Sequence, residues 1–159
     1  MALHVSDHVV CPPHAMDGYF SSDDRLPYIT QIMTPSASVQ HLLALCDDAR
    51  ILLFDKTQLA APYDTIRVPE EEAFTALSNI ESDENAWMGT SVSGYVAVWD
   101  ARAPTSEPQM RLTGTSKSPY LSVASNGIYV ATGTELKGSD ALIDIWDLRQ
   151  TTKPVHTYS

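Results

Sequence analysis

Four side chains that could bind a metal ion stand close together near the start of the chain. They are His4, His8, Cys11 and His14. Imidazole and thiolate groups bind zinc, and four ligands would complete a tetrahedral structural site. Their spacing matches no established zinc motif, and a stretch of solvated loop residues explains them more simply. We therefore expect no metal and no cofactor, and keep a zinc-binding module as a remote alternative.

The nucleophilic side chains support catalysis less than the His and Cys residues support metal binding. Cys46 and Ser93 could act as nucleophiles, but neither stands in a catalytic motif. The chain contains no Gly-x-Ser-x-Gly and no His-Glu-x-x-His pattern, and its glycines do not assemble into a phosphate-binding loop. The sequence therefore predicts a protein that is not an enzyme, with catalysis as a second remote alternative.

Two arginines stand in a repeated context that favours protein recognition. The repeated boxes are Trp99-Asp100-Ala101-Arg102 and Trp146-Asp147-Leu148-Arg149. A guanidinium group is a planar fork that can make paired hydrogen bonds to a carboxylate or to backbone carbonyls. Arg102 and Arg149 are therefore candidate partner-binding residues. The simpler alternative is that each arginine pairs with a nearby acid of its own chain.

A dipeptide that occurs three times predicts the strands that hold these boxes. Each copy closes a short apolar run, and the copies are Phe54-Asp55, Trp99-Asp100 and Trp146-Asp147. Their aspartates are 45 and 47 residues apart. Four short strand-like runs surround each copy, which predicts an all-β fold of four-stranded antiparallel sheets. An aromatic-Asp pair at about this period is typical of WD40 β-propeller blades.

The same pattern divides the chain. Residues 1–27 are rich in turn signals and form an irregular N-terminal leader, and residues 28–159 form the repeat region. We expect blades at roughly residues 28–68, 73–113 and 120–159. A closed propeller takes about 4–8 blades, so three blades predict an incomplete propeller. It would be an N-terminal piece of a longer protein, or would close or associate with another chain through its open blade edges.

The buried tryptophans of the third strands need a hydrogen-bond partner for their indole N–H groups. In WD40 repeats that partner belongs to a polar network that includes an aspartate in the turn before the third strand. Asp48 and Asp140 occupy that turn by position, and Ser93 replaces them in the second repeat. The Gly-His dipeptide that often opens a repeat is absent here. We therefore expect incomplete polar networks inside the blades.

A narrower resemblance lies in the last two repeats. Residues 99–103, 130–135 and 140–147 resemble the WD repeat-containing protein 89 family, in which Gly-Thr-Glu, an acidic loop and an Asp-Ala-Leu strand follow one another. The two consecutive Trp-Asp-x-Arg boxes resemble those of WD40 substrate receptors of cullin-4 ubiquitin ligases. That likeness implies a ligase adaptor as partner for Arg102 and Arg149.

Composition narrows the class of partner. Twenty acidic and ten basic residues give a formal net charge of −10, which disfavours binding to nucleic acid. Two cysteines indicate a reducing compartment, and neither a signal peptide nor a membrane span is evident. We therefore expect an intracellular protein of the nucleus or cytoplasm. Its predicted function is that of a non-catalytic interaction scaffold for other proteins, with a cullin-4 substrate receptor as the alternative.

Overall fold

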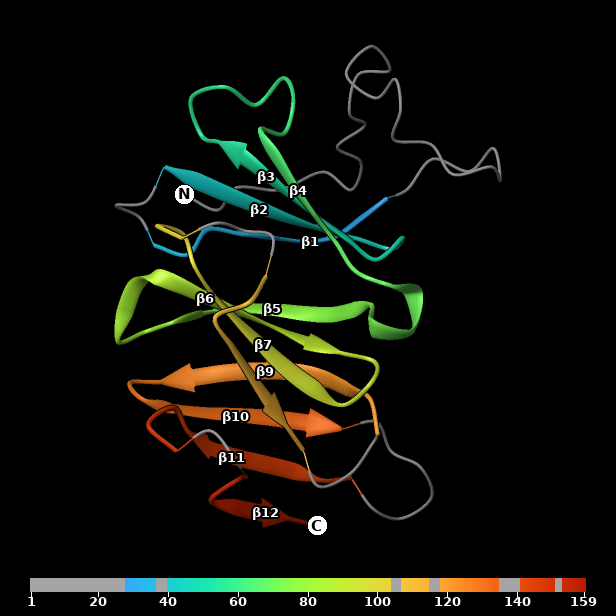
Figure 1. Ribbon diagram of the computed structural model, residues 1–159, viewed down its shortest axis with the longest axis vertical. Coiled ribbons are helices and arrows are strands. Elements are labelled where there is room, and N and C mark those ends of the chain that lie inside the picture. Colours follow the sequence, from blue (N-terminus) through green and yellow to red (C-terminus); the bar gives the residue numbers. More distant parts are fainter. Residues whose placement is uncertain (1–27, 37–39, 104–106, 115–117, 135–140, 151–152) are drawn as a thin grey trace, which may run out of the picture.

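The computed structural model describes residues 28–36, 40–103, 107–114, 118–134, 141–150 and 153–159. They form three four-stranded antiparallel sheets stacked face to face (Figure 1). The predicted fold class, three WD40-type propeller blades, is confirmed. The four metal-ligand candidates of the leader lie outside the described residues.

Strand order follows chain order in every sheet, so each sheet is a simple meander. The first sheet contains β1 (Ile29–Met33), β2 (His41–Cys46), β3 (Arg50–Asp55) and β4 (Asp64–Arg67). The second contains β5 (Phe74–Ile80), β6 (Asp83–Ser91), β7 (Tyr95–Asp100) and β8 (Met110–Thr113). The third contains β9 (Tyr120–Asn126), β10 (Tyr129–Thr134), β11 (Ile143–Asp147) and β12 (His156–Tyr158). A short 3-10 turn, η2 (Glu70–Glu72), joins the first two sheets.

The second sheet is buried on both faces because it lies between the other two. Side chains alternate along a strand, so Tyr95, Ala97 and Trp99 of β7 face the first sheet. Val96 and Val98 face the third sheet, where they pack with its buried side chains. Burial on both faces explains why β7 reads as a nearly continuous apolar run rather than an alternating one.

Hydrogen bonds from side chains tie the first strands of successive sheets together. The amide of Gln31 on β1 donates to the Leu77 carbonyl at 2.8 Å and accepts from the Leu77 N–H at 2.7 Å. The Thr75 hydroxyl on β5 donates to the carbonyl of Tyr120 on β9. These bonds connect the first strands of the three sheets.

Large apolar side chains of the third sheet are exposed, including Leu121, Tyr129, Ile143 and Tyr158, each about half accessible. In the first sheet, Ala44, Cys46, Leu52 and Phe54 form a buried cluster of their own.

Candidate functional site

The aspartate of each aromatic-Asp pair holds the turn that follows the third strand. Asp55 Oδ1 accepts the backbone N–H of Thr57 at 2.7 Å and the Thr57 hydroxyl at 2.6 Å. Asp100 and Asp147 accept the backbone N–H groups two residues later at 2.9 and 3.0 Å. An aspartate that bonds the backbone two residues onward forms an Asx turn. The aspartate thus recurs because it closes the turn in which each third strand ends.

In the second and third sheets this turn also fixes the candidate arginine. Arg102 donates from Nε to Asp100 Oδ1 at 2.8 Å and from Nη2 to Asp100 Oδ2 at 2.6 Å. Arg149 makes the same two bonds to Asp147 at 2.9 and 2.6 Å. The arginine side chains are 63% and 65% exposed. We call these two units the Asp-Arg turns. Pairing with a local acid, the simpler alternative, is therefore present, and it leaves both guanidinium groups accessible.

The Asp-Arg turns shift the pKa values of their acids. Hydrogen bonds from the Arg149 side chain and backbone lower the pKa of Asp147 from 3.8 to about 2. The same contacts from Arg102 lower the pKa of Asp100. A carboxylate whose pKa is depressed by folding stabilises the folded state above its ordinary pKa, and this contribution is lost as the pH falls through the depressed value.

We therefore expect Asp147→Asn to weaken the acid dependence of stability. The wild-type protein should lose unfolding free energy between about pH 4 and about pH 2, and the variant should lose less over that interval. Urea denaturation at a series of pH values measures the difference, with the exposed Glu81→Gln as control. An unchanged pH dependence in Asp147→Asn would contradict the assigned role of the carboxylate.

The third sheet contains a complete polar network around its tryptophan. Trp146 Nε1 donates to the Thr132 hydroxyl at 3.1 Å. Asp144 is fully buried and accepts the hydroxyl groups of Tyr120 at 2.5 Å and Thr157 at 2.6 Å. Burial and the bond to Asp144 raise the pKa of Tyr120. Each buried polar group here thus has a defined partner.

Sequence reasoning placed the network acid in the turn before the third strand. Asp48 in that turn of the first sheet forms an ion pair with Arg50, and the equivalent strand position holds Phe54, which has no indole N–H to satisfy. Asp140 lies outside the described residues. Asp144 was missed, although a carboxylate between two isoleucines in an apolar strand is an available signal for a buried acid.

The second sheet lacks the hydroxyl that the third sheet provides. Strand register aligns Trp99 with Trp146 and places Gly89 where Thr132 stands. Among the described residues, Trp99 Nε1 has no hydrogen-bond partner. A Cβ at Gly89 would lie 2.9 Å from the Phe74 ring, so the ring occupies the space of the missing side chain. The network of the second sheet is incomplete, as the sequence led us to expect. For the third sheet that expectation is wrong, because Thr132 and Asp144 complete the network there.

Aromatic packing replaces the polar network in the second sheet. Trp99 stacks on Trp87 with ring centroids 4.3 Å apart and meets the edge of Phe74 at 5.3 Å. Phe74 in turn meets Tyr95 edge-on at 6.2 Å. Stacked and edge-to-face pairs stabilise beyond the area they bury, so this cluster forms a firm aromatic wall.

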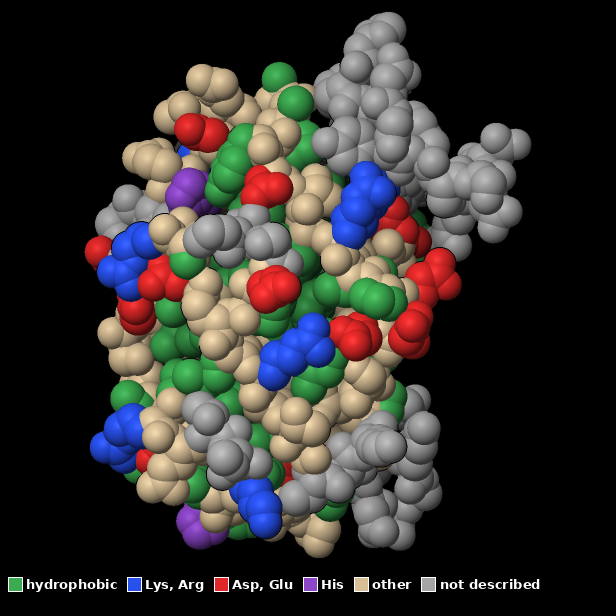
Figure 2. All heavy atoms as spheres, viewed as in Figure 1, with side chains coloured by type: hydrophobic (Ala, Val, Ile, Leu, Met, Phe, Trp, Pro, Cys, Tyr) green, Lys and Arg blue, Asp and Glu red, His purple; other side chains and the backbone are tan. Residues whose placement is uncertain are grey.

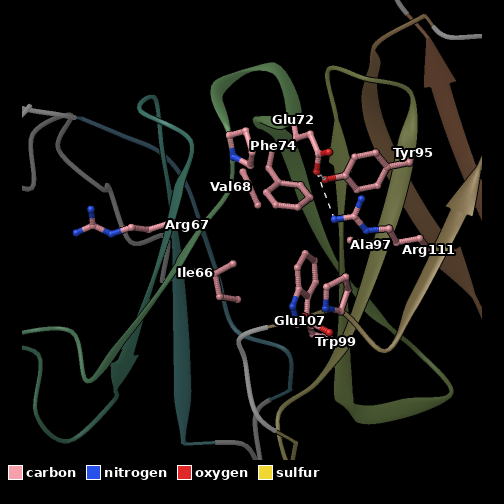
Figure 3. A pocket seen from close by; sticks show the side chains of 12 residues that line it. Ile66, Arg67, Val68, Glu72, Phe74, Tyr95, Ala97, Trp99, Glu107 and Arg111 are labelled. Carbon is pink, nitrogen blue, oxygen red and sulfur yellow. Dashed lines mark hydrogen bonds and ion pairs between the residues drawn. The ribbon is translucent and has the colours of Figure 1, made fainter.

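That wall lines a groove of about 400 Å³ between the later strands of the first and second sheets (Figure 3). We call it the interblade groove. Its lining residues are Ile66, Arg67, Val68, Pro69, Glu72, Phe74, Tyr95, Ala97, Trp99, Glu107, Pro108 and Arg111. Sequence reasoning missed this groove because its walls come from different repeats.

Two of the charged residues that line the groove, Glu72 and Arg111, are paired with each other. Arg111 lies 3.3 Å from Glu72 and 4.6 Å above the Tyr95 ring. The Tyr95 hydroxyl donates to the same Glu72 carboxylate at 3.0 Å. The Arg67 side chain points away from the groove (Figure 3). The groove therefore has a mixed lining of apolar and charged side chains, and the buried Trp99 Nε1 has no partner among the described residues.

The candidate metal ligands and nucleophiles among the described residues do not form a site. Within the part of the chain that the structure describes, no three His, Cys, Asp or Glu side chains are grouped to hold a metal ion. Cys46 is buried, and the Ser93 hydroxyl bonds to that of Ser91 at 2.9 Å. In the same part of the chain, no helix has the length and apolar character to cross a membrane.

Three stacked four-stranded meanders, each ending its third strand with the same aspartate turn, define WD40-type β-propeller blades. No protein-family model matches the chain, and the search of curated proteins also gives no match. Among solved structures 594 chains match, so the architecture is a common one and does not select a function.

One similar solved structure is described as "Crystal Structure of Mitotic Checkpoint Complex". The match has a TM-score of 0.64 and 20% sequence identity, and covers 83% of this chain and 37% of that chain. This chain therefore spans less than two-fifths of the length of the protein it matches. At this identity the likeness shows the fold alone. Neither it nor the other comparisons support the WD repeat-containing protein 89 subgroup.

Proposed function

We propose that the protein is a non-catalytic interaction scaffold whose Asp-Arg turns contact a protein partner. The fold supports this role, because blade interiors are used for packing and the turns between strands remain for recognition. Function is argued from sites and not from fold. The observation that carries the proposal is the matched geometry of Arg102 and Arg149 on consecutive sheets.

A guanidinium held in place before binding is well suited to recognition. In each Asp-Arg turn the aspartate accepts from Nε and Nη2, and Arg102 Nη2 also donates to Asp83 Oδ2 at 3.3 Å. The remaining N–H donors of each fork can bond a partner's carbonyl or carboxylate oxygens. Because the side chain is already ordered, less conformational entropy is lost when the partner binds. The turns follow equivalent strands of neighbouring sheets, so a partner can contact both.

The charge distribution favours protein over nucleic acid as the partner. The chain has a formal net charge of −10. On the face shown in Figure 2, the described Lys and Arg side chains are scattered, and several have acidic neighbours. A phosphate backbone is attracted by a continuous basic stripe, and the distribution on this face does not form one.

A cullin-4 ligase adaptor is the finer form of this proposal. It is supported by the resemblance of two consecutive Trp-Asp-x-Arg boxes to those of cullin-4 substrate receptors, and by the exposure of both guanidinium groups. Residues 99–149 also resemble the WD repeat-containing protein 89 family, which is consistent with a scaffold and names no partner.

The test is capture of partners by the immobilised full chain. We expect Arg102→Ala/Arg149→Ala to lose at least about tenfold in affinity for a partner that the wild type captures, because charged hydrogen bonds at the centre of an interface are worth several kcal/mol. Arg67→Ala/Lys153→Ala removes the same charge elsewhere and should retain capture. In a second experiment, the wild type and both double variants are tested for binding to purified cullin-4 adaptor.

Equal capture by both double variants would overturn the role of the Asp-Arg turns. Arginine-dependent capture of other proteins, with no binding of purified adaptor, would retain the scaffold and overturn the cullin-4 form. Circular dichroism of each variant checks that the blades remain folded.

A further inference from the structure

The two Asp-Arg turns differ in the residue that lies opposite the aspartate on the neighbouring strand. In the third sheet Tyr129 of β10 pairs with Asp147, and in the second sheet Ala86 of β6 pairs with Asp100. Directly opposite residues of an antiparallel pair have Cβ atoms about 4.5–5.5 Å apart. Tyr129 is 48% exposed, whereas Ala86 is buried. The turn of the third sheet therefore has an exposed phenol beside it, at a position where the second sheet has a buried methyl group.

Tyr129 and Asp147 contact the same guanidinium group. Figure 1 shows that the start of β10 and the end of β11 lie at the same end of the third sheet. Hydrogen bonds to Asp147, and to a smaller degree to the Tyr129 hydroxyl, raise the pKa of Arg149. A phenol oxygen that accepts from a guanidinium retains its own O–H as a donor. Arg149 and Tyr129 thus present guanidinium and hydroxyl donors side by side, and we call this pair the Arg149–Tyr129 site.

Arg102 is surrounded by more negative charge than Arg149. Arg102 Nη2 donates to Asp100 Oδ2 at 2.6 Å and to Asp83 Oδ2 at 3.3 Å, and both acids raise the pKa of Arg102. The strands β9 and β10, which lie on one side of the Arg149 turn, contain no charged side chain over residues 120–134. In the contacts that the structure describes, two carboxylates thus surround the guanidinium of the second sheet, and one contacts that of the third.

This difference in charge predicts a different ligand for each turn. A carboxylate accepts charge-assisted hydrogen bonds from a guanidinium, and these are about twice as strong as bonds between neutral groups. At Arg102 an incoming carboxylate would approach Asp83, and like charges in an interface repel, whereas a neutral carbonyl meets no such repulsion. At Arg149 the second polar group is the Tyr129 hydroxyl, which can donate to the same carboxylate. The third sheet therefore favours an acidic ligand, and the second sheet favours a neutral one.

We propose that the Arg149–Tyr129 site binds the carboxylate of an Asp or Glu side chain of the partner protein. The guanidinium donates to one carboxylate oxygen, and the Tyr129 hydroxyl donates to the other. The Arg102 turn binds an uncharged acceptor of the same partner, such as a backbone carbonyl. This inference rests on the proposed scaffold function and adds to it the chemistry of each contact, with Tyr129 as a residue that determines specificity.

The test follows the arginine Nε–H signals by heteronuclear NMR of the full chain. The probe is the blocked peptide acetyl-Gly-Glu-Gly-amide, and the comparison peptide replaces Glu with Gln. The two signals are assigned by their loss in Arg149→Lys and Arg102→Lys. We expect the Glu peptide to shift the Arg149 signal at least about twofold more than the Gln peptide does, the size expected of an exposed ion pair. The Arg102 signal should respond about equally to the two peptides.

Two substitutions test the two parts of the argument. Tyr129→Phe keeps the ring and removes the hydroxyl, so the Glu peptide should shift the Arg149 signal at least about twofold less. Asp83→Asn removes the additional carboxylate, so the Arg102 signal should respond at least about twofold more to the Glu peptide than in the wild type. Tyr158→Phe is the matched control, because it removes an exposed phenol from β12 of the same sheet and should leave the Arg149 response unchanged.

Three results would overturn the inference. The first is an Arg149 signal that shifts equally with the Glu and Gln peptides. The second is an Arg149 response that Tyr129→Phe leaves unchanged. The third is an Arg102 signal that responds to the Glu peptide as strongly as Arg149 does in the wild type.

The result is separable from the test of the Asp-Arg turns. Partner capture that depends on Arg102 and Arg149, together with an Arg149 signal that does not distinguish Glu from Gln, overturns only the carboxylate site. A preference for the Glu peptide at Arg149, together with capture that ignores both arginines, supports the carboxylate site and overturns the function proposed for the turns.

Discussion

Asp144→Ala is expected to destabilise the protein by about 2 kcal/mol, because it removes the acceptor of the buried Tyr120 hydroxyl. Asp144 is fully buried and accepts from Tyr120 at 2.5 Å and Thr157 at 2.6 Å. The Tyr120 hydroxyl is then buried without an acceptor, whereas Thr157 is exposed and its hydroxyl can bond to water. Urea denaturation followed by circular dichroism measures the loss.

Tyr120→Phe/Asp144→Ala provides the control for this prediction. It removes the buried donor together with its acceptor, so we expect the double variant to lose less stability than the sum of the two single losses. A loss below about 1 kcal/mol for Asp144→Ala alone would show that the network contributes little.

The matched pair Trp146→Phe and Trp99→Phe is expected to differ in stability by about 1 kcal/mol or more. Both changes remove an indole from a buried third strand, so the lost apolar area is similar. Trp146→Phe also breaks the bond to Thr132 at 3.1 Å, whereas Trp99→Phe removes a donor without a partner among the described residues. Trp146→Phe should therefore be the less stable variant.

Thr132→Val isolates the hydrogen bond in this comparison. In a Thr132→Val background, Trp146→Phe should cost less than in the wild type, because the acceptor is already absent. Trp99→Phe should cost the same in both backgrounds. Equal losses for the two Trp→Phe variants in the wild type would contradict the distinction between the second and third sheets.

The blades could be predicted from the sequence because their signals are local. Each aromatic-Asp pair closes a short apolar run, and the period between pairs matches a four-stranded blade. The reason for the aspartate is also local, since it bonds the backbone two residues onward at Asp55, Asp100 and Asp147. The pairing of each candidate arginine with its own aspartate was an alternative that the sequence already offered.

The groove and the buried network could not be predicted in the same way. Phe74 and Gly89 stand on different strands. The Phe74 ring fills the space beside Gly89 only once β5 and β6 are paired in register. The far wall of the groove comes from Ile66 of another sheet. Asp144 reads as one polar residue in a strand until Tyr120 and Thr157 are brought to it from neighbouring strands.

The turn before the third strand shows a further limit of sequence patterns. Ala49 has a φ of 63°, a left-handed conformation, whereas the equivalent turn of the second sheet uses Gly94 with a φ of 78°. That conformation costs an L-residue about 1–2 kcal/mol. Ala49 is buried beside β3, so the packing of its side chain offsets this backbone cost. The residue type alone would not have predicted a left-handed conformation at this position.

Photo-crosslinking tests most directly whether the Asp-Arg turns are the partner surface. A p-benzoylphenylalanine at position 103 or 150 stands one residue beyond Arg102 or Arg149 and leaves both arginines in place; the same group at position 121 marks the exposed third sheet. We predict that positions 103 and 150 crosslink to the same protein partner and that position 121 does not. Crosslinks at position 121 alone, or none at positions 103 and 150 while the partner is bound, would contradict the proposed function.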